Sequence, residues 1–219
     1  MVSKGGTDAC FAFIDAHLEL NPSHVVAECD LECAFNMFDR AIIWEQLRNV
    51  PGLSGILPYV AAVYGVEATI VLERGDLGPL RIGNSVGGRQ GCVLAMLLFC
   101  LAHHPAMLET AARHPGTRLV AFADDTKTCG NYDAVPAAIA TYTGLYALET
   151  NGSINADKSG FYSPEVEEPD VREAIADAGL PDDIAVLRDG VVVVGAPIGT
   201  AAFVTKFVKG EVTRKSKAL

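Results

Sequence analysis

The sequence contains no hydrophobic run near the roughly 18 apolar residues that a transmembrane helix requires. Its opening residues, MVSKGGTDAC, lack the basic cluster and apolar core of a secretory signal. None of the six cysteines forms a Cys-x-x-Cys pair or lies at zinc-site spacing from a histidine. These absences predict an intracellular protein with reduced cysteines, no disulfide framework and no membrane association.

Positive charge is also scarce. The chain has 17 Lys and Arg against 27 Asp and Glu, a formal net charge of -10. Five of the basic residues and one acidic residue lie from position 206 onward, which leaves 12 basic and 26 acidic residues in 1–205. Phosphate binding favours Lys and Arg. The acidity therefore either argues against polymer binding or indicates that basic parts lie outside this chain.

Hydrophobic residues, by contrast, make up half of the 219 positions, enough for a sizeable core in one generous domain. We expect helices over 8–20, 36–50, 53–64, 92–108, 132–150 and 169–178, and strands over 24–31, 69–74, 79–82, 117–123, 126–129, 160–162 and 191–194. Strands and helices mix without strict alternation. The pattern predicts an α+β fold with an antiparallel sheet packed on helices.

Two adjacent acids, Asp124 and Asp125, follow the apolar residues 119–123. Carboxylates at the end of a buried strand repel each other and lose hydration unless a cation neutralises them. Hard divalent metals with oxygen ligands provide that neutralisation. An ordinary Asp-Asp surface turn without a metal is the alternative.

A further acid, Asp30, ends the apolar strand predicted over 24–31. Two-metal phosphoryl transfer needs carboxylates that bridge ions roughly 3.5–4 Å apart. Asp30 can join Asp124 and Asp125 only if the two strands lie side by side. The alternative for Asp30 is a cap on the following helix, a role that Asn36 could also fill.

Five short segments follow one another along the chain: 30–36 (DLECAFN), 88–99 (GRQGCVLAMLLF), 122–125 (FADD), 155–159 (NADKS) and 194–199 (VGAPIG). In this order they resemble the first palm motif, the second palm motif, the aromatic-x-Asp-Asp box, the Asn-x-x-Lys motif and the primer-gripping Leu-Gly segment of reverse transcriptases of the non-LTR retrotransposon type. Each motif is weak by itself, but the ordered set covers most of the chain. The resemblance implies a polymerase palm.

The resemblance implies an RNA-directed DNA polymerase that adds dNTPs to a DNA primer 3′-hydroxyl on an RNA template. Asp30, Asp124 and Asp125 would hold two Mg²⁺ ions, with Mn²⁺ as a substitute. One ion would lower the pKa of the primer hydroxyl, and the other would hold the triphosphate. Lys158 would neutralise or protonate the departing pyrophosphate, with a solvated surface lysine as the alternative.

The same resemblance implies nucleotide-binding roles for Phe35, Arg89, Gln90 and Gly91. Phe35 would exclude a 2′-hydroxyl from the sugar site, with a core phenylalanine at a helix start as the alternative. Gln90 and Gly91 would lie beside the incoming nucleotide and the template. Arg89 would reach a phosphate or brace the loop. Cys92 follows Gln-Gly where family members often have Asp, which removes one acid beside this site.

Val194 and Gly195 would form the primer grip, and Lys127 and the basic residues near the C-terminus could contact the nucleic-acid backbone. Charge runs at a terminus are, however, usually solvated tails.

In this family basic fingers precede the palm and a thumb follows it. We therefore expect one reverse-transcriptase domain, with 1–23 the end of the fingers, 24–199 the palm, and 200–219 the start of the thumb or connection, or a basic tail. The acidic balance then indicates a truncated retroelement product, nuclear if it belongs to an active element. The alternative is a catalytically inactive remnant that binds nucleic acid or protein. An unrelated metal-dependent phosphohydrolase is disfavoured by the motifs at 88–91 and 155–158.

Overall fold

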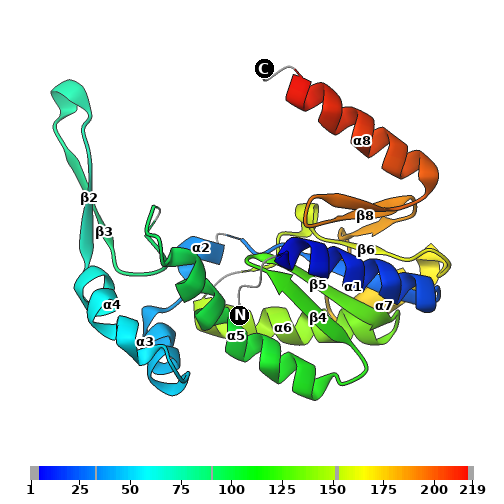
Figure 1. The fold of residues 1–219 in the computed structure, drawn as a ribbon, viewed down its shortest axis with the longest axis horizontal. Helices are drawn as coiled ribbons and strands as arrows, with labels where there is room; N and C mark the ends of the chain where they lie inside the picture. The colour runs from blue at the N-terminus through cyan, green and yellow to red at the C-terminus, as the bar shows by residue number, and fades with distance from the viewer. Residues whose placement is uncertain (1–4, 33, 90, 151–152, 217–219) are drawn as a thin grey trace. The chain divides into compact units, whose positions relative to one another are not determined.

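The computed structural model describes residues 5–32, 34–89, 91–150 and 153–216 (Figure 1). The chain divides into two compact units. The first unit comprises Met1–Glu32, Met107–Gly144 and Ser153–Leu219, and the second comprises Cys33–Ala106 and Leu145–Gly152. Two long helices, α5 (Ala95–Arg113) and α6 (Ala134–Thr150), contain residues of both units.

A five-stranded sheet forms the centre of the first unit, in the order β4-β5-β1-β6-β7. Its strands are β1 (His24–Cys29), β4 (Arg118–Phe122), β5 (Asp125–Asn131), β6 (Gly160–Tyr162) and β7 (Ala185–Leu187). Neighbouring strands are antiparallel except for the parallel pair β6-β7. The fold is therefore α+β with a largely antiparallel sheet packed on helices, as predicted.

Helix α1 (Gly6–Leu20) packs against one face of this sheet. Its buried residues Cys10, Ile14 and Leu18 are spaced by four, which places them on one side of a helix. They share a hydrophobic cluster with Val26 of β1 and Cys129 of β5, which are directly paired across the strands.

A short hairpin of β8 (Gly190–Val193) and β9 (Ala196–Gly199) contributes to the same cluster through Val191, Val193 and Ile198. The remaining elements of this unit are the 3-10 turn η3 (Ala156–Lys158), α7 (Glu168–Asp177) and α8 (Ala201–Ser216).

The second unit contains short helices and a two-stranded ribbon. Its elements are α2 (Ala34–Met37), α3 (Arg40–Asn49), η1 (Ser54–Ile56), α4 (Leu57–Tyr64), β2 (Ala68–Leu72), η2 (Gly75–Leu77) and β3 (Leu80–Asn84). Buried Arg40 organises the unit, because its guanidinium donates hydrogen bonds to the carbonyl oxygens of Asn84, Val86 and Gly87 at 3.0–3.1 Å. Its Cζ also lies 5.1 Å from the centroid of the Tyr64 ring.

The helix predicted over 36–50 is wrong at its start. It is divided into α2 and α3, and Asp39 begins α3, where its carboxylate oxygen accepts a hydrogen bond from the Ala41 N–H at 2.8 Å. Neither Asp30 nor Asn36 is the cap of α3. A capping carboxylate at Asp39 satisfies an otherwise unpaired N–H of the first turn, so this position fixes where the helix begins.

One helix is longer than predicted, and three elements were not predicted. Helix α5 continues to Arg113 through Pro105 instead of ending near 108. Strands β7 and β9 and helix α8 were not predicted, and most of the segment 200–219 is helical. Across the described ranges, none of the helices combines the length and apolar character needed to cross a bilayer.

Candidate active site

Asp30 and Asp125 lie at neighbouring strand ends. Strand β1 ends at Cys29, which is paired with Thr126 of β5, and Asp30 and Asp125 are the next residue along each strand. The two strands thus lie side by side, the arrangement that a shared carboxylate site requires. Their side chains are both partly accessible, 38% for Asp30 and 31% for Asp125.

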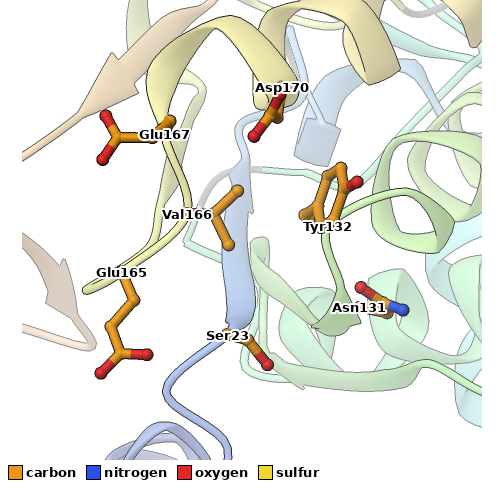
Figure 2. A pocket seen from close by; sticks show the side chains of 7 residues that line it. All are labelled: Ser23, Asn131, Tyr132, Glu165, Val166, Glu167 and Asp170. Atoms are coloured by element: carbon orange, nitrogen blue, oxygen red, sulfur yellow. The ribbon is translucent and has the colours of Figure 1, made fainter.

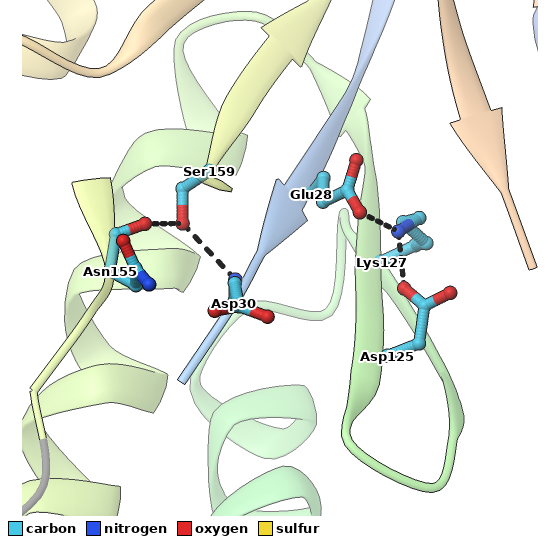
Figure 3. Close-up of polar contacts among 6 residues, drawn as sticks. All are labelled: Glu28, Asp30, Asp125, Lys127, Asn155 and Ser159. Carbon is cyan, nitrogen blue, oxygen red and sulfur yellow. Dashed lines mark hydrogen bonds and ion pairs between the residues drawn. The ribbon is translucent and has the colours of Figure 1, made fainter. Parts of the chain in front are cut away.

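Backbone and hydroxyl hydrogen bonds fix Asp30 against the segment 155–159 (Figure 3). The Asp30 N–H donates to the Ser159 hydroxyl at 3.1 Å, and that hydroxyl donates to the Asn155 carbonyl at 2.8 Å. The Asn155 N–H in turn donates to the Asp30 carbonyl at 2.9 Å. Hydrogen bonds thus join two motifs that lie more than 100 residues apart in the sequence. Ser159, which takes part in two of these bonds, was not singled out from the sequence.

Lys158 extends from this unit and remains largely in solvent. Its Nζ lies 3.9 Å from Asp30 Oδ2, and its side chain is 70% exposed. An exposed ion pair at this distance has little stabilising effect. The lysine is therefore available to bind an incoming anion.

The turn between β4 and β5 presents Asp124 to solvent. Phe122 and Asp125 are paired across the strands, so the turn has only two central residues, Ala123 and Asp124. Ala123 has φ +60°, a left-handed conformation that costs a residue with a Cβ roughly 1–2 kcal/mol. Such strain is typical of functional turns, where the surrounding structure enforces a particular side-chain direction.

Lys127 is fully buried and binds two carboxylates, as Figure 3 shows. Its Nζ lies 2.8 Å from Glu28 Oε1 and is also ion-paired and hydrogen-bonded to Asp125 Oδ1. The expectation that Lys127 contacts nucleic-acid backbone is wrong, because its side chain has no exposed surface. Glu28 was not singled out from the sequence, and neither was the pairing of Lys127 with Asp125. Alternate residues of a strand share a face, so Lys127 lies on the same face as buried Cys129.

The donors at this site suit a hard divalent cation, since carboxylate oxygens are the ligands that Mg²⁺ and Mn²⁺ prefer. Cys29 is unsuitable as a ligand, because burial, with a smaller effect of the Asp30 carboxylate, raises the pKa of its thiol to about 12. Within the part of the chain that the structure describes, no three His, Cys, Asp or Glu side chains gather closely enough to hold a metal. Asp30 and Asp125 are thus adjacent in the fold without converging on one point.

The second unit contains the residues predicted to bind nucleotide. Phe35 in α2 is half-buried, and its ring centroid lies 4.7 Å from that of Phe99 in α5. Arg89 donates from Nη2 to the Val66 carbonyl at 3.2 Å, and its Cζ lies 5.5 Å from the centroid of the Tyr64 ring. These contacts match the bracing role considered for Arg89.

Gly91 is exposed and has φ +83°, which favours glycine, while Gln90 lies outside the described residues. The preceding Gly87 is required for a different reason. A Cβ at Gly87 would lie 2.3 Å from the Asn36 backbone, so the loop packs directly onto α2. The predicted nucleotide-binding loop is therefore anchored at its base by α2.

The predicted primer grip, Val194 and Gly195, is the two-residue turn of the β8-β9 hairpin. Both residues have positive φ, +44° and +85°, as a type I′ turn requires. Val194 also packs against the hydrophobic cluster of the first unit. The turn is thus tied to the core.

One pocket lies at the other end of the sheet from these carboxylates. It has a volume of about 410 Å³ and is lined by Ser23, Asn131, Tyr132, Glu165, Val166, Glu167 and Asp170 (Figure 2). Ser23 precedes β1 and Asn131 ends β5, so the pocket lies at the opposite end of both strands from Asp30 and Asp125. Its acidic lining disfavours phosphate, and the pocket is separate from the candidate active site.

The fold is similar to solved telomerase structures. An apo telomerase from Candida tropicalis, truncated from its C-terminal domain, matches with a TM-score of 0.58 and 13% identity over 93% of this chain and 40% of that chain. Telomerase from Candida albicans, in complex with the TWJ fragment of telomeric RNA, matches with a TM-score of 0.60 and 10% identity over 92% and 34%. This chain has a reverse-transcriptase-like polymerase fold and spans less than half of either solved chain. No protein-family profile and no curated protein matches the sequence.

Proposed function

We propose that this chain carries the catalytic carboxylates of an RNA-directed DNA polymerase of the non-LTR retrotransposon type. The proposal combines the reverse-transcriptase-like fold with the five ordered motifs. The observation that carries it is the position of Asp30 and Asp125 at the ends of paired strands, where the segment 155–159 is hydrogen-bonded to Asp30. Sequence motifs far apart in the chain thereby support one site.

Divalent magnesium, when bound, supplies positive charge that lowers the pKa of the primer 3′-hydroxyl and offsets charge on the triphosphate. Asp30, Asp124 and Asp125 would hold it through their carboxylate oxygens. Their attachment to paired strands and a two-residue turn keeps them at one end of the β1-β5 pair, where bound ions would draw the carboxylates together. Manganese has the same preference for oxygen ligands and would substitute.

Lys158 would act on the leaving group. Its ammonium is exposed beside Asp30 and can reach an anion that leaves this site. Donation of a proton from Nζ to the departing pyrophosphate, or neutralisation of its charge, would assist bond breaking. Phe35, Arg89, Gln90 and Gly91 would form the nucleotide-binding side, and Val194 with Gly195 would contact the primer.

The proposed partners are an RNA template, a DNA primer and dNTPs. The Candida albicans neighbour is in complex with an RNA fragment, which supports a nucleic-acid ligand for this fold. We propose that 24–199 correspond to a palm, 1–23 to the end of a fingers region, and 200–219 to the start of a thumb or connection, or a basic tail. The net charge of -10 predicts that the chain alone binds a primed template weakly.

The test is Mg²⁺-dependent dNTP incorporation on a primed RNA template. We expect slow, poorly processive incorporation by the wild type and none by an Asp124→Asn, Asp125→Asn double variant. An Asp170→Asn, Asp177→Asn variant, which removes two acids of the same unit at α7, should incorporate like the wild type. Absence of incorporation by folded wild-type protein would contradict autonomous polymerase activity.

An inactive palm that binds nucleic acid or protein is the second candidate. The ion pair between Lys127 and Asp125 favours it, because an internal cation already neutralises one proposed metal ligand. This candidate predicts retention of primed template on the folded chain without nucleotide incorporation, and the Asp124→Asn, Asp125→Asn variant would retain the template equally well.

A further inference from the structure

The carboxylate site contains a cation of its own. Lys127 lies in β5, between two other strands, and is paired on one side with Val120 of β4 and on the other with Glu28 of β1. Its side chain has 0% exposure and points toward the carboxylates of Glu28 and Asp125. Burial of an ammonium group without partners is strongly unfavourable, so these two ion pairs are what allow a lysine here.

The surroundings prevent Lys127 from leaving this position easily. Strand β5 is hydrogen-bonded along both edges, and α1 covers the face on which the lysine lies. Cys10 of α1 is close enough to be affected by both charges. Burial and then the Asp125 carboxylate raise the pKa of its thiol, whereas Lys127 lowers it. The ammonium group is therefore enclosed by β1, β5 and α1.

The charge balance of this cluster is incomplete. One ammonium faces two carboxylates, Glu28 and Asp125, and Asp125 uses one of its two oxygens for Lys127. A divalent ion bound through Asp125 would experience repulsion from the ammonium a few ångströms away. The ion would also share the Asp125 carboxylate with Lys127, which already neutralises part of its charge.

We propose that Lys127 is a resident cation of the candidate active site, which holds Asp125 and weakens divalent-metal binding there, while Glu28 moderates this effect by sharing the ammonium. The inference rests on the proposed role of Asp125 as a metal ligand. It assigns Lys127 and Glu28 as positioning residues that set the metal affinity of the palm. Removal of the cation should strengthen metal binding, and removal of Glu28 should weaken it.

The test is Mn²⁺ binding to the full chain, measured from the electron paramagnetic resonance signal of free Mn²⁺. Lys127→Met keeps most of the length of the side chain and removes its charge, and we expect Mn²⁺ binding to be tighter by roughly tenfold or more. Glu28→Gln should weaken binding severalfold, because the ammonium then acts on Asp125 alone. Lys209→Met, which removes an exposed charge on α8, is the matched control and should stay within about twofold of the wild type.

Each outcome has a defined meaning. Asp125→Asn added to Lys127→Met should abolish the gain, and a gain that persists would overturn the inference. Equal Mn²⁺ affinity in the wild type, Lys127→Met and Glu28→Gln would also overturn the inference. In that case, weaker Mn²⁺ binding by Asp30→Asn would still support the proposed metal site. No Mn²⁺ binding by any folded variant at millimolar concentration would overturn both this inference and the proposed function. If Lys127→Met does not fold, Glu28→Gln provides the test: weaker Mn²⁺ binding than in the wild type supports the inference, and unchanged binding overturns it.

Discussion

Two lysines, Lys127 and Lys158, each lie beside one of the proposed metal ligands, and they differ in almost every other respect. Lys127 is fully buried and held between Glu28 and Asp125, whereas Lys158 is 70% exposed and 3.9 Å from Asp30. Lys127 is therefore part of the folded interior, whereas Lys158 is accessible to solvent and to ligands. Burial, more than proximity to a carboxylate, determines which lysine can respond to a ligand.

The largest expected effect is on stability at the buried lysine. Lys127→Ala leaves Glu28 and Asp125 close together without their cation, and we expect a loss of about 3–5 kcal/mol in the free energy of unfolding. Lys127→Met should cost less, because a methionine fills the space with apolar atoms. Urea denaturation followed by circular dichroism measures both. A Lys127→Ala loss no larger than that of Lys158→Ala would show that burial does not distinguish the two lysines.

The second unit offers a buried ionisable group of another kind. Burial, with a smaller effect of His104, lowers the pKa of His103 to about 4, against about 6.5 in an unfolded chain. Between these values the unfolded state binds a proton that the folded state does not. The free energy of unfolding is therefore highest above pH 6.5 and falls as the pH falls toward 4, by on the order of 3 kcal/mol in total.

His103→Phe isolates this contribution, since a phenylalanine preserves a ring next to Phe99, whose centroid lies 5.0 Å from that of His103. Denaturation at pH 7 and pH 4.5 should show a smaller acid-induced loss in the variant. Burial raises the pKa of Glu149 to about 7. Its effect on the pH dependence of stability has the opposite sign, but it is the same in the wild type and in His103→Phe. Parallel pH profiles for the two proteins would refute the assignment.

A smaller effect is expected in the turn that presents Asp124, which is positioned by the backbone and not by a buried lysine. Ala123→Gly relieves the left-handed conformation at φ +60° and should raise the free energy of unfolding by about 0.5–1 kcal/mol. Ala121→Gly in strand β4 is the matched control and should lower it by a similar amount. A thermal melt compares the two. A loss at both positions would mean that the Ala123 conformation is not strained.

The smallest effect is expected at the exposed lysine. Lys158→Ala should change the free energy of unfolding by less than about 0.5 kcal/mol, because solvent screens its ion pair with Asp30. The same substitution should slow nucleotide incorporation if Lys158 assists the leaving group. A stability loss comparable to that of Lys127→Ala would place Lys158 in the folded core and contradict its exposed position.

The sequence predicted those parts of the fold that local patterns determine. The apolar run of β1 and the short strand β6 were located correctly, and the condition that the strands of Asp30 and Asp125 lie side by side is met by β1 and β5. The polar sequence of β5, DTKTCGN, gives little sign that the strand is almost wholly buried. That burial comes from its neighbours β1, β4 and α1. The role of Lys127 could not be predicted for the same reason, since it depends on which side chain the next strand supplies.

The wrong start of the helix predicted over 36–50 has a local cause, because two residues there could cap a helix. Asn36 and Asp39 both have capping side chains, and only the packing of the surrounding chain favours Asp39. The roles of Phe35, Arg89, Gly91, Val194 and Gly195 remain predictions from the motifs.

The most direct test of the central claim, that Asp30, Asp124 and Asp125 hold divalent ions, is anomalous X-ray scattering from crystals of the wild-type chain soaked in Mn²⁺. We predict an anomalous peak within coordination distance of the Asp30 and Asp124 carboxylates, with Asp125 as a shared ligand. Soaked crystals of the Asp124→Asn, Asp125→Asn variant should lack it. A peak elsewhere, or none at these carboxylates at millimolar Mn²⁺, would contradict the account.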